Sequence, residues 1–105
     1  MRDLPSLIAT LEAATEGSAE LDRAICRAIS GDETQWHKYT RSLDAAMTLV
    51  PEGWFALIDT RGRADVRYAP IDQSGYRREV ADAATPALAL CIAALRARLA
   101  IDGKE

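Results

Sequence analysis

The chain has 105 residues, a length typical of one domain that folds around a single hydrophobic core without disulfides or metal ions. Apolar residues make up 49% of it and charged residues 28%, a balance that excludes an intrinsically disordered chain. The net charge of −3 gives no electrostatic reason to expect binding to nucleic acid or to an anionic membrane.

The sequence predicts a cytoplasmic protein. It contains no apolar run of signal-peptide or membrane-spanning length. Its two cysteines, Cys26 and Cys91, lie on separate predicted helices without a Cys-x-x-Cys motif, so we interpret them as free thiols. Cys91 is expected in the core, whereas Cys26 falls between two charged positions on the helical wheel and is expected nearer to solvent.

Residues 1–31 are predicted to form an N-terminal pair of helices. The first helix begins near Asp3, and the pattern is interrupted at residues 16–18. Ser18 is a suitable N-cap for the second helix, and Gly31 supplies the left-handed residue that favours a helix end. The apolar stripes of the two helices are Leu4, Leu7, Ile8 and Leu11, and Leu21, Ala24, Ile25, Ala28 and Ile29. Because the connection is short, the helices are expected to be antiparallel neighbours.

Residues 32–39 show no helical or strand period and are predicted to be a loop. A third helix is expected to open at Thr40 or Ser42 and to stop before Pro51. Residues 54–58 then form a short, dense, apolar strand whose two faces are both apolar, which is typical of a strand covered on both sides.

A turn over residues 59–63 leads to a second strand over 64–71, which pairs back on the first as a hairpin. Residues 72–75 are expected to form another turn. The alternation over 76–81 is consistent with a third strand or with a loop, and the pattern does not decide between them.

The helix predicted over 85–99 is the centre of the fold. Thr85 can cap it, and Pro86 occupies the first helical position, where a missing N–H costs nothing. One face carries Leu88, Ile92, Leu95 and Leu99, and the opposite face carries Leu90, Ala93, Ala94 and Ala97. A helix that is apolar nearly all round is buried on two sides. The order of elements therefore predicts one α+β domain, with a short antiparallel sheet of two or three strands sandwiched by helices.

Three segments carry a family resemblance. Residues 39–46 read YTRSLDAA, residues 50–54 read VPEGW, and residues 84–95 read ATPALALCIAAL. These motifs resemble those of the phage ABA sandwich domain family, small proteins of phages and prophages, many of them in proteobacteria. The resemblance implies a sheet between helical layers, with an ABA-sandwich-like core over 40–101. The family has no characterised activity, so it supplies no catalytic residues.

The residues predict neither catalysis nor a bound cofactor. His37 is the only histidine and lies in a polar loop, where a solvated side chain is the ordinary interpretation. No Cys/His cluster has the spacing of a metal site, and no glycine-rich phosphate loop is present. We therefore expect no catalytic residues, no metal ion, no cofactor and no enzymatic activity.

Four residues are candidates for contact with a partner: Trp36, His37, Arg61 and Arg63. Trp36 either packs on the core or is presented to a partner. Arg61 and Arg63, in the hairpin turn, either bind phosphate or an acidic partner, or pair with the neighbouring aspartates.

The predicted function is that of a non-enzymatic accessory or protein-interaction domain. The alternative is an inhibitor of a host nucleic-acid-handling or defence enzyme that acts through an acidic surface, because residues 1–32 hold six acidic residues against three arginines. A monomer is favoured over a homodimer. A homodimer would use the second face of the 85–99 helix, around Ala93 and Ala94.

Overall fold

The computed structural model describes residues 4–31, 36–68 and 77–102. Within these ranges the chain forms an α+β fold, with an antiparallel sheet of three strands and flanking helices, so the predicted α+β class with a short antiparallel sheet is confirmed. The elements are α1 (Leu4–Ala13), α2 (Ala19–Ser30), α3 (Leu43–Met47), β1 (Phe55–Asp59), β2 (Arg63–Tyr68), β3 (Arg77–Asp82) and α4 (Pro86–Asp102). The open choice over 76–81 is resolved as a strand for its described residues, 77–81, which belong to β3. The turn expected over 72–75 lies outside the described residues.

The predicted caps set the helix ends. The Ser18 side chain accepts a hydrogen bond from the Leu21 amide at 3.2 Å, and Gly31 ends α2 with a φ of 75°. At the start of α4, the Thr85 hydroxyl accepts a hydrogen bond from the Leu88 amide at 3.2 Å. Polar side chains and one left-handed glycine therefore satisfy backbone groups that a helix end leaves unpaired.

The strands are arranged in the order β1-β2-β3, and the register separates their side chains onto two faces. Residues directly opposite each other share a face. The inner face carries Ala56, Ile58, Ala64, Val66, Tyr68, Arg77, Glu79 and Ala81. The outer face carries Phe55, Leu57, Asp59, Arg63, Asp65, Arg67, Arg78, Val80 and Asp82.

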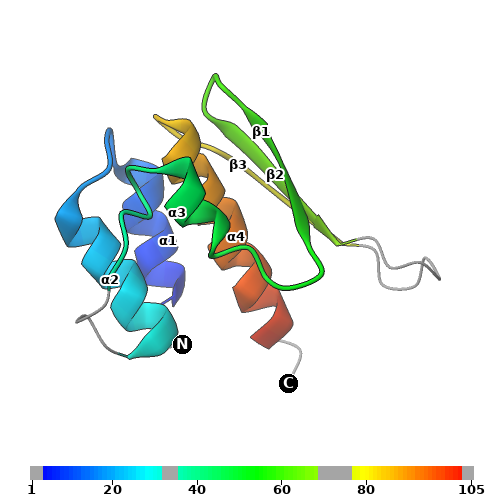
Figure 1. Ribbon diagram of the computed structural model, residues 1–105, viewed down its shortest axis with the longest axis horizontal. Helices are drawn as coiled ribbons and strands as arrows, with labels where there is room; N and C mark the ends of the chain where they lie inside the picture. The colour runs from blue at the N-terminus through cyan, green and yellow to red at the C-terminus, as the bar shows by residue number, and fades with distance from the viewer. Residues whose placement is uncertain (1–3, 32–35, 69–76, 103–105) are drawn as a thin grey trace.

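Helix α4 lies at the centre of the molecule. It packs on the inner face of the sheet on one side and on α1 and α3 on the other (Figure 1). Every residue from Leu88 to Leu95 is fully buried, as a helix with two apolar faces requires. Although α4 is long, none of the helices in the described ranges is both long and apolar enough to cross a membrane.

The second apolar face of α4, which was considered as a possible dimer interface, is buried inside the monomer. Leu90, Ala93, Ala94 and Ala97 have no exposed surface, because the helix is enclosed within the monomer on both sides. The monomer therefore covers the face that the alternative, a homodimer, would have used.

The expectation that the first strand is covered on both sides is wrong. Phe55 is 46% exposed and Leu57 is 50% exposed, and both lie on the outer face. The described helices lie on the other side of the sheet, where α1 and α3 pack on α4 instead of on the strands (Figure 1). The apolar pattern identified two apolar faces, but only the inner one has a covering helix.

Candidate interaction surface

A charged cluster occupies the middle of the outer face. Asp65 is buried beneath two arginines: the Arg67 Nη2 atom lies 2.8 Å and the Arg78 Nη2 atom 2.7 Å from its Oδ2 atom. The Nε groups of both arginines also donate hydrogen bonds to this carboxylate. These hydrogen bonds hold the pKa of Asp65 well below its ordinary value. Asp65 therefore stays ionised at neutral pH, and its charge is balanced within the sheet.

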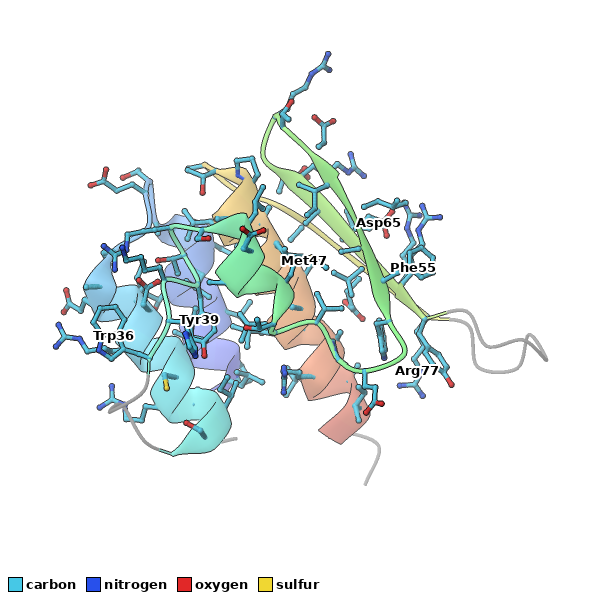
Figure 2. All side chains as sticks on the ribbon, viewed as in Figure 1. Trp36, Tyr39, Met47, Phe55, Asp65 and Arg77 are labelled. Atoms are coloured by element: carbon cyan, nitrogen blue, oxygen red, sulfur yellow. The ribbon has the colours of Figure 1, made fainter. Side chains whose placement is uncertain are left out.

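An exposed apolar stripe lies beside this cluster. On strand β1, Phe55 lies directly opposite Arg67, and Leu57 lies directly opposite Asp65. Figure 2 shows Phe55 and Asp65 on the side of the sheet that faces away from the helices. Large apolar side chains can stay exposed next to one another on one face of a protein. Such a group marks a contact site more often than a single exposed apolar side chain does.

Strand β1 is also an edge strand. It pairs with β2 on one side, and its other side has no partner among the described strands. Residues 54–58 contain no charge and no proline, the usual protections of an exposed edge. Ile58, at this edge of the inner face, is 36% exposed. We call Phe55, Leu57, Ile58 and the free edge of β1 the β1 surface.

The opposite edge of the sheet is protected. Strand β3 carries Arg77, Arg78, Glu79 and Asp82 among its six residues. The Arg96 side chain of α4 also donates a hydrogen bond to the Val80 carbonyl at 2.9 Å. Charged side chains and an occupied backbone acceptor both oppose the addition of another strand at β3.

A shallow hollow borders the β1 surface at the end of the strand. Its volume is about 210 Å³, and its walls are Leu57, Ile58, Asp59, Arg63 and Asp65. The hollow therefore joins the apolar β1 surface to the charged side chains of Asp59, Arg63 and Asp65.

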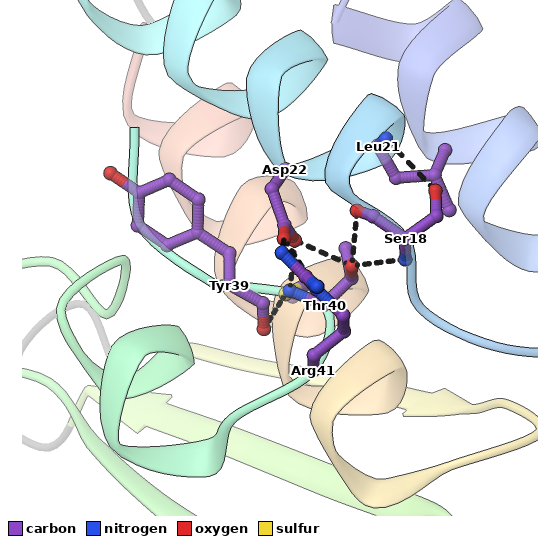
Figure 3. A network of polar contacts seen from close by, with 7 residues as sticks. Ser18, Leu21, Asp22, Tyr39, Thr40 and Arg41 are labelled. Carbon is purple, nitrogen blue, oxygen red and sulfur yellow. Dashed lines mark hydrogen bonds and ion pairs between the residues drawn. The ribbon is translucent and has the colours of Figure 1, made fainter. Parts of the chain in front are cut away.

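A second polar cluster ties the segment before α3 to helix α2 (Figure 3). Asp22 is fully buried. Its Oδ1 atom accepts hydrogen bonds from the Thr40 amide at 2.7 Å and from the Thr40 hydroxyl at 2.5 Å. Its Oδ2 atom lies 2.9 Å from the Arg41 Nη2 atom. We call Asp22, Thr40 and Arg41 the Asp22 cluster, and its polar groups are satisfied within the chain.

Thr40 therefore belongs to this cluster and does not open the third helix. Of the two predicted openings, Ser42 is the N-cap, and its hydroxyl accepts a hydrogen bond from the Ala45 amide at 3.4 Å. The crossing of the two segments is tight, because a Cβ atom on Gly17 would lie 2.0 Å from the Thr40 carbonyl oxygen. The contact needs a glycine at this position.

The structure places Trp36 against Arg23 of α2, and His37 follows it in the segment before α3. Trp36 is half-buried and packs against the core, with the guanidinium groups of Arg23 and Arg41 5.8 and 5.9 Å from its ring. His37 is exposed and meets the Tyr39 ring edge-on at 5.7 Å. Trp36 was expected either to pack on the core or to be presented to a partner, and in the structure it packs on the core.

Arg61 and Arg63 lie elsewhere, in the turn between β1 and β2 and at the start of β2. Both are exposed, and Arg63 lines the hollow beside the β1 surface. The Arg61 amide donates a hydrogen bond to Asp59 Oδ1 at 2.8 Å, which shapes the turn. The four predicted contact residues are therefore divided between two regions, and only the hairpin pair adjoins the β1 surface.

Phe55 and Leu57 were missed as candidate contacts. Their side chains alternate with the inner-face residues of a strand that is apolar throughout, so the sequence pattern assigned both to the core. The one feature of the sequence that could have indicated an exposed contact strand was the lack of any charge over residues 54–58. A central strand can lack charges in the same way, so this feature does not distinguish the two.

Both cysteines are buried, and neither is part of a disulfide. The Cys91 thiol donates a hydrogen bond to the Tyr39 carbonyl at 3.1 Å, and burial raises its pKa. Cys26 is only 5% exposed, so the expectation that it lies near solvent is wrong. The described part of the chain holds no group of three or more side chains that could bind a metal ion.

No protein-family model matches the chain, and neither a curated protein nor a solved structure does.

Proposed function

We propose that this protein is a non-enzymatic interaction domain that binds another polypeptide through the β1 surface. The observation that carries the proposal is the half-exposure of Phe55 and Leu57 on an edge strand without charge. An extended segment that pairs with β1 would satisfy the outward backbone groups of the strand and cover both side chains.

The size of the surface favours a reversible complex. Covering the exposed halves of Phe55 and Leu57 contributes about 1 kcal/mol each, and each new backbone hydrogen bond contributes about 1 kcal/mol. Part of this gain is offset by the loss of translational and rotational freedom on association. The expected complex is accordingly weaker than that of an obligate dimer, whose interface is much larger.

The proposal includes an accessory role in a phage or prophage setting, in the cytoplasm. The resemblance of residues 39–99 to phage ABA sandwich proteins supports the first part. The second part is supported by the two buried cysteines, because neither forms a disulfide and the fold therefore needs no oxidising compartment.

The alternative of an inhibitor with an acidic surface has less support. Asp22 is buried and paired with Arg41, and Glu12 is paired with Arg96, so neither contributes a free surface charge. Within the described residues 4–31, the exposed acidic residues without such an ion pair are Glu16, between α1 and α2, and Glu20, in α2. Two carboxylates are a small basis for electrostatic recognition of a basic channel.

In the test, two copies of the full-length chain are expressed together, and each copy carries a different affinity tag. The wild type, Leu57→Lys and the matched control Leu43→Lys are purified through one tag. Leu43 is an exposed apolar residue of α3, 39% exposed and outside the β1 surface. We expect the wild type and Leu43→Lys to retain a protein in fixed stoichiometry, and Leu57→Lys to lose it.

Thermal unfolding of the three proteins checks that each is folded. Equal retention by Leu57→Lys and the wild type would show that the β1 surface is not the binding site. Substrate turnover that a single polar substitution abolishes would contradict the non-enzymatic part of the proposal.

A further inference from the structure

We propose that the polypeptide bound by the β1 surface is a second copy of this chain, paired antiparallel with β1 about a two-fold axis at Ala56. Two sheets of three strands then become one continuous sheet of six. This inference rests on the proposed function, because it names the partner of the same surface. It replaces the α4 face, which the monomer itself buries, as the route to a homodimer.

Symmetry restricts how a strand can pair with its own copy. In an antiparallel pair, hydrogen-bonded and non-hydrogen-bonded residue pairs alternate. A two-fold axis must therefore pass through a pair formed by one residue and its own copy. For β1 this leaves a small set of registers, each named by its central residue.

Over residues 54–58, the register centred on Ala56 is the one that keeps every pair apolar, and it leaves Asp59 opposite Gly53 of the second copy. It places Phe55 opposite Leu57 of the second copy, and Trp54 opposite Ile58 of the second copy. The two Phe–Leu pairs extend the stripe on the outer face, where both side chains are now about half exposed. The two Trp–Ile pairs cover Ile58 on the inner face. Aromatic and aliphatic cross-strand pairs of this kind stabilise a sheet.

The neighbouring registers are less favourable. An axis at Leu57 places Phe55 opposite Asp59 of the second copy, and an axis at Ile58 places Leu57 opposite Asp59. Both bring a carboxylate against an apolar side chain. An axis at Phe55 would need the chain to stay extended at Gly53, where φ is 88° and the backbone turns.

The charges of the sheet agree with edge pairing. Residues 54–58 carry no charge, so two copies of the strand meet without like-charge repulsion. On the neighbouring strands of the outer face, Arg67 and Arg78 are both paired with Asp65 within each monomer, so their side chains are already engaged there. Stacking the two outer faces would instead remove this cluster from water, which is costly for ion pairs.

Disulfide trapping tests the register. With the axis at Ala56, the two Cα atoms of residue 56 are expected to lie about 4.5–5.5 Å apart, within the range that a disulfide spans. Under mild oxidation we expect Ala56→Cys to form a covalent dimer and Leu57→Cys to stay largely monomeric. The wild type is the background control, because both native thiols are buried. Cross-linking of Leu57→Cys in preference to Ala56→Cys would overturn the register.

Light scattering tests the dimer without any cross-link. Across a series from about 10 µM to about 1 mM, suited to a small interface, the wild-type mass should rise from 11.4 kDa toward twice that value. Leu43→Lys should follow the wild type, and Leu57→Lys should stay at the monomer mass. A wild-type mass that stays at 11.4 kDa, or a doubling that Leu57→Lys shares, would overturn the inference.

The affinity capture described above separates the two proposals. A monomeric wild type that still retains another protein through Leu57 overturns the homodimer and leaves the interaction function standing. A monomeric wild type whose retention does not depend on Leu57 overturns both.

Discussion

In both the Asp22 cluster and the β1 surface, side chains lie in an environment opposite to the one that their polarity usually favours. In the first, a carboxylate and a threonine hydroxyl are buried. In the second, a phenylalanine and a leucine face solvent. The first departure is compensated inside the chain, because Asp22 accepts hydrogen bonds from Thr40 and Arg41. The second has no compensation among the described residues of the monomer.

From this difference we infer that the Asp22 cluster serves the fold, and we propose that the β1 surface serves binding. A buried polar group with all its partners holds segments of one chain together. The exposed halves of apolar side chains on an unprotected edge add little stability to the monomer, and their burial contributes free energy only when another chain covers them. Substitutions in the two regions should therefore have opposite consequences for folding and for association.

The largest effect is expected from a buried carboxylate that lacks partners. Leu95 is fully buried on α4, and Leu95→Asp places a charge there with none of the donors that surround Asp22. Loss of the side chain alone costs about 2–5 kcal/mol, and the unpaired charge adds to that cost. We expect no cooperative thermal transition by circular dichroism. Near-native melting would contradict the central position of α4.

The next largest effect comes from removing the charge of Asp22. Asp22→Asn keeps the size of the side chain but loses the ion pair with Arg41 and one hydrogen-bond acceptor. We expect the free energy of unfolding in urea to fall by about 2–4 kcal/mol. Glu20→Gln, an exposed change in the first turn of the same helix, is the control and should cost less than about 0.5 kcal/mol. Equal losses in the two variants would show that the Asp22 cluster has no special structural role.

A smaller, pH-dependent effect is expected on the outer face. Because Arg67 and Arg78 lower the pKa of Asp65 in the folded state, its contribution is fully present above the ordinary carboxylate pKa and is lost as the pH falls below that value. Asp65→Asn should cost about 1–2 kcal/mol at neutral pH. Urea unfolding at several pH values should show the gap between variant and wild type narrowing steadily as the pH falls below about 5. A gap independent of pH would contradict the ionised cluster.

The smallest effect on stability is expected at the β1 surface. Leu57→Lys replaces a side chain that is half exposed, so the free energy of unfolding of the dilute monomer should change by less than about 0.5 kcal/mol. The same change should abolish binding. A large loss of stability in the dilute protein would mean that Leu57 supports the monomer itself, and the contrast with Asp22 would fail.

Much of the fold could be predicted because local signals mark it directly. Ser18, Gly31 and Thr85 act at the chain positions where the sequence predicts helix ends. The nearly continuous apolar character of residues 86–95 indicated a helix buried on two sides, and α4 is one. These features depend on neighbours within a few residues.

The candidate site could not be predicted, because it depends on which element covers which face. The apolar sequence pattern around Phe55 and Leu57 is the same whether or not a helix packs on these side chains. The burial of Asp22 depends on Thr40 and Arg41, 18 and 19 residues away in the chain. Sequence reasoning accordingly counted Asp22 among the surface acids and assigned the outer face of the first strand to the core.

Amide hydrogen exchange at the two edges of the sheet tests the central claim most directly. The amides of β1 and of β3 are followed in the full-length protein at about 10 µM and at about 1 mM, because exchange reports protection residue by residue. If a second strand covers the free edge of β1, exchange over residues 55–59 slows at the higher concentration while exchange over residues 77–82 stays the same. Exchange over residues 55–59 that is identical at both concentrations, or slowing confined to β3, would contradict the account.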